Sequence, residues 1–104
     1  MIAGNDLLLS PMVMLELQYL FEISRLTVPP GTIIGTIQRA APLRICDLPF
    51  EDVARAALRE TWTRDPFDRV IVAQARLREI PLITKDRMIR EQYERAIWAR
   101  PRSR

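Results

Sequence analysis

The stretch that most constrains the fold of this chain is a helix expected to begin at Asp65-Pro66. Aspartate is a preferred N-cap, and proline is tolerated at the first helical position because its missing N–H would have no partner there. The segment VIVAQA (Val70–Ala75) follows and is apolar on nearly every side. A helix that is apolar all round is buried, and the small alanines allow it to press closely against a sheet. The sequence therefore predicts a core built around this helix.

Short apolar segments alternate with helical patterns along the rest of the chain. We expect extended segments at Leu7–Leu9, Leu43–Cys46 and Ile80–Thr84, with Ala96–Trp98 either a last strand or a packing segment. Helices are expected from Pro11 to about Arg25, over Gly31–Ala40, after Pro49, after Asp65 and around Ile89–Tyr93. Helices that alternate with short apolar strands predict an α/β fold with a parallel sheet.

The helix after Pro49 shows the clearest amphipathic pattern. Its apolar residues recur with helical spacing, and they are Phe50, Val53, Ala54, Ala57 and Leu58. A stripe of this kind is expected to meet the core on one side of the helix.

Composition limits the kinds of site that the chain can build. Because the chain contains no histidine, catalytic triads and metal sites that need this residue are excluded, and any metal must be a hard cation held by oxygen. The single cysteine, Cys46, excludes an internal disulfide and fits a reducing compartment. No segment has the length of a membrane span or the pattern of a signal sequence, so we expect a cytoplasmic protein.

The charge balance is mildly basic. The net charge is +3, and part of the excess lies in the tail 99–104, which we expect to be flexible. A basic balance suits an anionic partner such as nucleic acid, and an ordinary solvated surface explains it equally well.

Glu16 is the least ordinary charged residue. On a helical wheel it lies opposite Gln18 and Glu22, in the middle of an arc formed by Met12, Val13, Tyr19, Leu20 and Ile23. A carboxylate among apolar neighbours costs several kcal/mol unless it has a charged or hydrogen-bonding partner. Its partner is either an arginine in the core or a metal ion in a cleft.

Three aspartates lie at the ends of predicted elements. Asp65 and Asp68 begin the buried helix, and Asp86 follows the strand that ends near Thr84. Each suits a helix N-terminus, so capping alone explains them. In α/β sheets, however, ligands bind outside the carboxyl ends of the strands. Carboxylates gathered there repel one another unless a cation such as Mg²⁺ or Mn²⁺ neutralises them.

Four neighbours of these acids are further candidates. The hydroxyl of Thr84 is placed to orient water or a carboxylate, and Lys85 is placed to face a phosphate. Arg64 and Arg69 flank the acids, either to contact RNA phosphates or to form salt bridges with Asp65 and Asp68. Strand propensity and solvation are the ordinary explanations for Thr84 and Lys85.

Taken together, three segments resemble one family. SPMVMLELQYLFEISRL, TWTRDPFDRVIVAQA and LITKD, with IREQY behind it, are similar to PIN-domain ribonucleases of the VapC toxin type, over about Leu8 to Trp98. The resemblance implies a three-layer α/β/α sandwich around a short parallel sheet, formed by a single domain over 1–104. It also implies Mg²⁺- or Mn²⁺-dependent hydrolysis of RNA, a homodimer, and a small antitoxin that blocks the site.

The resemblance also assigns roles by position. It implies that Glu16, Asp68 and Asp86 are the catalytic metal ligands, and that Asp65 and Thr84 support them. RNA contacts would then come from Arg64, Arg69 and Lys85.

The chain departs from this family at its start. Domains of this type begin with a central strand that carries the first catalytic aspartate, and Asp6 lacks the preceding apolar strand. We therefore expect an N-terminally truncated domain whose uncovered strand edges are open to pairing.

Three functions are consistent with the sequence: an endoribonuclease toxin, an inactive remnant that binds an antitoxin or its own copies, and a basic RNA-binding module without chemistry.

Overall fold

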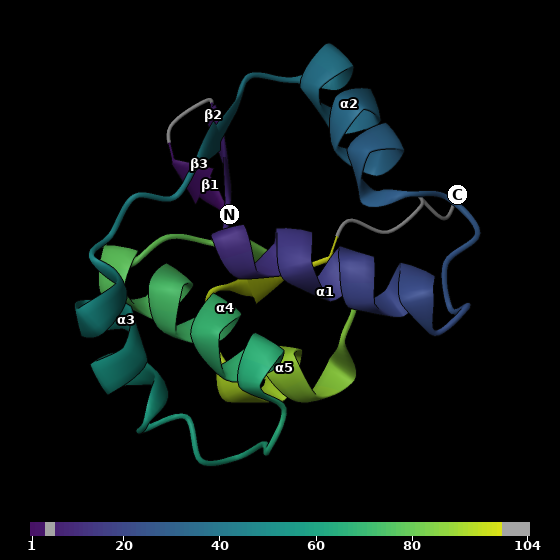
Figure 1. The fold of residues 1–104 in the computed structure, drawn as a ribbon. Coiled ribbons are helices and arrows are strands. Elements are labelled where there is room, and N and C mark those ends of the chain that lie inside the picture. Colours follow the sequence, from purple (N-terminus) through teal and green to yellow (C-terminus); the bar gives the residue numbers. More distant parts are fainter. Residues whose placement is uncertain (4–5, 99–104) are drawn as a thin grey trace, which may run out of the picture.

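The computed structural model describes residues 1–3 and 6–98, which contain five helices and five short strands (Figure 1). The strands are β1 (Ile2–Ala3), β2 (Asp6–Leu9), β3 (Leu43–Ile45), β4 (Leu82–Ile83) and β5 (Ala96–Ile97). The helices are α1 (Pro11–Glu22), α2 (Pro30–Ala40), α3 (Phe50–Ala57), α4 (Pro66–Arg78) and α5 (Arg87–Gln92). The predicted α/β fold with parallel strands is confirmed.

The strands form two small sheets. In the first sheet β2 pairs with β3 in parallel, and the second sheet consists of the parallel pair β4 and β5. Strand β1, which the sequence did not predict, adds to β2 in the antiparallel direction. The N–H of Ile2 also donates to the carbonyl of Pro81 at 3.2 Å. Strand β1 therefore joins the edge of the first sheet to the segment that leads into β4.

Helix α4 is the centre of the core, as its sequence predicts. All six residues of Val70–Ala75 are buried. Ile71, Val72 and Ala75 form a cluster with Leu82, Ile89 and Tyr93, while Val70 and Ala73 pack against Val53 and Ala57 of α3. The two faces of α4 therefore hold both the strands and the neighbouring helix in place, and Figure 1 shows α3 beside α4.

A buried hydrogen-bonding group ties the end of α4 to β4. The hydroxyl of Tyr93 donates to the carbonyls of Ala75 and Ile80, at 3.0 and 2.7 Å. The carbonyl of Ala75 also accepts the N–H groups of Glu79 and Ile80, so the tyrosine matters most as a donor to the carbonyl of Ile80, where α4 gives way to the strand.

The amphipathic stripe of α3 is only partly buried. Val53 and Ala57 are buried as predicted, but Phe50 and Leu58 are 68% and 71% exposed. Helix α3 has eight residues and packs mainly on α4. Because Phe50 begins the helix and Leu58 follows its last residue, both extend beyond the contact. The expectation that the whole stripe meets the core was wrong at its two ends.

Helix α1 is also shorter and more exposed than expected. It ends at Glu22 rather than near Arg25, because Ser24 adopts a left-handed backbone conformation with φ 64°. Tyr19 and Ile23, which belong to its predicted apolar arc, are 50% and 44% exposed. Neither α1 nor α2 contains a fully buried residue.

The predicted basic tail 99–104 lies outside the described residues. Within the described part of the chain, no helix is both long enough and apolar enough to cross a membrane.

Candidate active site

Two aspartates are delivered by the helices that they cap. Asp65 is the N-cap of α4, and its Oδ1 accepts the N–H groups of Phe67 and Asp68 at 2.9 and 3.4 Å. Asp86 is the N-cap of α5, and its Oδ1 accepts the N–H of Ile89 at 2.9 Å. Each cap uses Oδ1, so Oδ2 of each aspartate is left for another partner.

A threonine two residues earlier holds each of these caps. The Oγ1 of Thr63 accepts the N–H of Asp65 at 3.1 Å, and the Oγ1 of Thr84 accepts the N–H of Asp86 at 3.0 Å. The sequence therefore contains the same turn twice, as Thr-Arg-Asp and Thr-Lys-Asp. Sequence reasoning found Thr84 and missed Thr63, although the repeated spacing is the signal that would have identified it.

Glu16 reaches the same place from α1. Its carboxylate and those of Asp65 and Asp68 each offer an oxygen, and these oxygens lie within 4.8 Å of one another. The packing of α1 against α4 produces this convergence. The tight group thus contains Asp65, where the family resemblance assigned the third metal ligand to Asp86.

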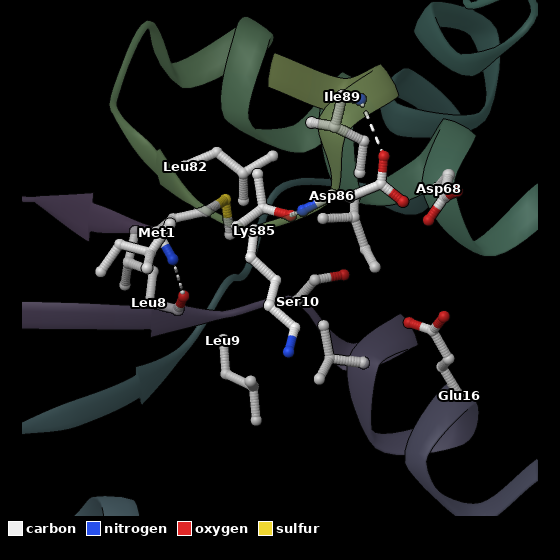
Figure 2. A pocket seen from close by; sticks show the side chains of 14 residues that line it. Met1, Leu8, Leu9, Ser10, Glu16, Asp68, Leu82, Lys85, Asp86 and Ile89 are labelled. Carbon is white, nitrogen blue, oxygen red and sulfur yellow. Dashed lines mark hydrogen bonds between the residues drawn. The ribbon is translucent and has the colours of Figure 1, made fainter. Parts of the chain in front are cut away.

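Asp86 lines a cavity together with two members of this group, Glu16 and Asp68. The cavity has a volume of about 560 Å³ and is lined by Glu16, Asp68 and Asp86 together with apolar residues of β2, β4 and α4. Figure 2 shows the carboxylates of Asp86 and Asp68 on one side and that of Glu16 reaching toward them from α1. Glu16, Asp68 and Asp86 therefore surround one space, and Asp65 lies close to the first two of them.

Two of the acids, Glu16 and Asp68, have raised pKa values. Burial, followed by the charges of Asp65, Glu16 and Asp86, together raise the pKa of Asp68 to about 6. The pKa of Glu16 is raised for the same reasons, first by burial and then by Asp65 and Asp86. Unneutralised carboxylates held together in a partly buried site are expected to behave in this way.

No protein cation neutralises this group in the described part of the chain. None of the ion pairs found there involves Glu16, Asp65, Asp68 or Asp86. Within these residues, the arginine partner considered for Glu16 is not found.

Two of the three basic residues near the acids bond to backbone carbonyls, and the third lines the cavity. Arg69 donates from Nε to the carbonyl of Thr63 at 2.8 Å, and Arg64 donates from Nη1 to the carbonyl of Thr61 at 3.3 Å. Lys85 lines the cavity, and Figure 2 shows its side chain extending across it near Ser10.

The donor set fits a hard divalent cation. The three clustered side chains offer only carboxylate oxygens, which Mg²⁺ and Mn²⁺ prefer. Mg²⁺ is commonly held through one or two carboxylates with water and substrate phosphate completing its shell. The open cavity beside the cluster provides space for such a substrate group.

Comparison with known families assigns the chain. A model of the PIN domain matches residues 1–95. The chain belongs to the PIN-domain family. No curated protein and no solved structure shows a significant match to it. Proteins with a PIN domain are generally nucleases that act on RNA and typically use divalent metals, and the acidic cluster of this PIN domain has the chemistry that such a metal requires.

Proposed function

We propose that this PIN domain is a metal-dependent endoribonuclease that cleaves RNA phosphodiester bonds as the toxin of a toxin–antitoxin pair. The observation that carries the proposal is the convergence of Glu16, Asp65 and Asp68 within 4.8 Å, with Asp86 lining the same cavity. Holding these acids together without a cation is unfavourable, and a bound divalent ion removes that cost.

Each acid has a distinct part in the proposed site. Glu16, Asp68 and Asp86 hold Mg²⁺ or Mn²⁺, while Asp65 caps α4 and so sets the direction of Asp68. Thr84 holds the turn that presents Asp86. When bound, the ion activates water and stabilises the negative charge that develops on the phosphate.

The basic residues around the acids contact the RNA backbone in this proposal. Lys85 already lines the cavity, so its ammonium group is placed to meet a phosphate beside the acids. Arg64 and Arg69 lie on the α4 side, where their present bonds to backbone carbonyls leave further guanidinium donors for phosphate.

Cleavage of labelled RNA by the purified chain tests the proposal. We expect cleavage with Mg²⁺ or Mn²⁺, loss of cleavage in EDTA, and loss in Glu16→Gln and Asp86→Asn. Glu22→Gln is the matched control, because Glu22 is an exposed acid on the same helix as Glu16. Cleavage that persists in EDTA, or in both site variants, contradicts the proposal.

A catalytically inactive PIN remnant that binds an antitoxin or its own copies is the second candidate. Exposed apolar side chains on α1 favour it, since Leu15, Tyr19 and Ile23 are 56%, 50% and 44% exposed and follow one another at helical spacing.

In both candidates we propose a single domain over 1–104 that acts in the cytoplasm as a homodimer with a cognate antitoxin.

Light scattering and coexpression with a neighbouring antitoxin gene distinguish the two candidates. Stable association without RNA cleavage, lost in Leu15→Glu and Tyr19→Glu, supports the remnant. Metal-dependent cleavage by the same preparation excludes it.

A further inference from the structure

Trp98 lies beside the turn that presents Asp86. Strands β4 and β5 are parallel, with Ile83 opposite Ile97, and the N–H of Thr84 donates to the carbonyl of Ile97 at 2.9 Å. Trp98 is the next residue after β5, as Thr84 is after β4. Because paired strands lie about 5 Å apart, the backbone of Trp98 is next to Thr84, whose hydroxyl accepts the N–H of Asp86.

The two tryptophans of the chain differ in their surroundings. Trp62 packs against the core, and its Nε1 donates to Oε1 of Glu60 at 2.8 Å. Trp98 is 44% exposed, and within the described residues its indole N–H has no such acceptor. Ile83 and Ile97, its neighbours on the two strands, are 43% and 45% exposed. This tryptophan is therefore available to a ligand, whereas Trp62 serves the fold.

The charges next to Trp98 favour a nucleic acid as that ligand. Lys85, Arg87 and Arg90 are exposed residues of the adjoining turn and of α5. Arg87 pairs with Glu91 at 3.6 Å, and Arg90 donates from Nη2 to the carbonyl of Lys85 at 3.3 Å, which leaves it further guanidinium donors. Lys85 also lines the cavity that holds the acids. An aromatic surface with basic neighbours is the combination that binds single-stranded nucleic acid, through base stacking and phosphate contacts. A protein partner that covered only apolar side chains would leave these charges unused.

We propose that Trp98 stacks against a nucleobase of single-stranded RNA next to the cleaved phosphate. This inference rests on the proposed ribonuclease function and adds a specificity-determining residue to it. Thr84, which is next to Trp98 across the paired strands, lines the cavity with the acids, so the proposed base belongs to a nucleotide that adjoins a phosphate held there. Bases inside a duplex are already stacked and are not splayed out for side chains, so the subsite selects unpaired RNA.

Fluorescence of Trp98 in a Trp62→Phe background tests the stacking directly. The probe is an eight-nucleotide single-stranded RNA, added with Ca²⁺, which takes oxygen ligands as Mg²⁺ does, while a gel verifies that the RNA stays intact. We expect quenching by the single strand and little by the same RNA in a duplex. In the wild-type background, Trp98→Ala should weaken binding about 5- to 150-fold, the range of one base–aromatic stack, and Trp98→Phe should retain most of it.

Phe50→Ala is the matched control, because Phe50 is an exposed aromatic residue of α3 and its loss should leave RNA affinity unchanged. Equal quenching by duplex RNA, or unchanged affinity in Trp98→Ala, overturns the subsite. So does a change in molecular mass of Trp98→Ala by light scattering without any effect on RNA binding, which would identify a protein interface. Thermal unfolding checks that the variants fold.

The outcomes separate this inference from the ribonuclease proposal. Quenching without metal-dependent cleavage leaves the subsite standing and removes the nuclease. Cleavage with full affinity in Trp98→Ala leaves the nuclease standing and removes the subsite.

Discussion

Replacing Asp68 by asparagine is expected to stabilise the protein while it abolishes the proposed metal site. Folding raises the pKa of Asp68 from 3.8 to about 6, so the folded state disfavours its charged form. At about 1.4 kcal/mol per pKa unit, the rise corresponds to roughly 3 kcal/mol above pH 6. The site is open to solvent on the cavity side, and screening reduces this cost to about 1–2 kcal/mol.

A second effect acts in the opposite direction. Asp68 is the third residue of α4, where a negative charge gains about 0.3–1 kcal/mol from the helix dipole. Asparagine loses this gain. We therefore expect Asp68→Asn to increase the free energy of unfolding by about 1 kcal/mol at pH 8, which raises the melting temperature by roughly 4–8 °C for a domain of this size.

The pH dependence follows from the sign of the pKa change. Because the folded pKa is raised, the wild-type protein loses stability as pH increases between 3.8 and about 6. The advantage of Asp68→Asn should be absent at pH 3.5, should grow through this window and should be constant above it. Denaturant unfolding of both proteins at several pH values measures the difference directly.

Asp52→Asn is the matched control for this experiment. Asp52 occupies the same position in α3 as Asp68 does in α4, and it is exposed. It should lose only the dipole contribution, so its stability at pH 8 should fall by about 0.3–1 kcal/mol. If Asp68→Asn is destabilised at pH 8, or is equally stabilised at pH 3.5, burial and the neighbouring carboxylates do not disfavour the charged form of Asp68 as argued.

Four further outcomes are expected. At Mn²⁺ concentrations about 100-fold above its dissociation constant, the wild-type protein should gain about 2.7 kcal/mol of stability, and Asp68→Asn should gain much less, as thermal shifts would show. Tyr93→Phe should cost about 1–2 kcal/mol in denaturant unfolding because the carbonyl of Ile80 loses the hydroxyl donor at 2.7 Å, whereas the half-exposed Tyr19→Phe should be neutral. Glu60→Ala should cost about 2–4 kcal/mol, since Glu60 is 5% exposed and accepts from Arg76 at 2.9 Å; a loss below 1 kcal/mol would contradict this. Val72→Ala should cost about 2 kcal/mol by opening a cavity at a fully buried position, measured in the same way.

The parts of the site that the sequence predicted well depend on local chemistry. An aspartate before the first turn of a helix is a preferred cap whatever surrounds it, so Asp65 could be assigned to α4 before any tertiary contact was known. Helical spacing likewise placed Glu16 among apolar neighbours, and the apolar segment Val70–Ala75 predicted its own burial. Each of these inferences depends only on residues that lie within a few helical turns of one another in the sequence.

Contacts between segments that are far apart in the sequence cannot be predicted from local spacing. Strand β1 has two residues and gains its partners from Leu7 and Pro81, neither of which marks it in the sequence. The exposure of Phe50 and Leu58 depends on where α4 ends its contact with α3, and spacing alone does not contain that information.

The sequence by itself determined that this chain has carboxylates at the entrance of a buried helix, no histidine to join them, and the segments of a PIN domain. Only the tertiary structure decided which carboxylates meet. Glu16 and Asp68 are 52 residues apart, and their separation in space depends on how α1 crosses α4. That crossing brings Asp65 into the tight group and lets Glu16 share the cavity with Asp68 and Asp86, because the packing of side chains between the helices sets the distance and residue spacing does not.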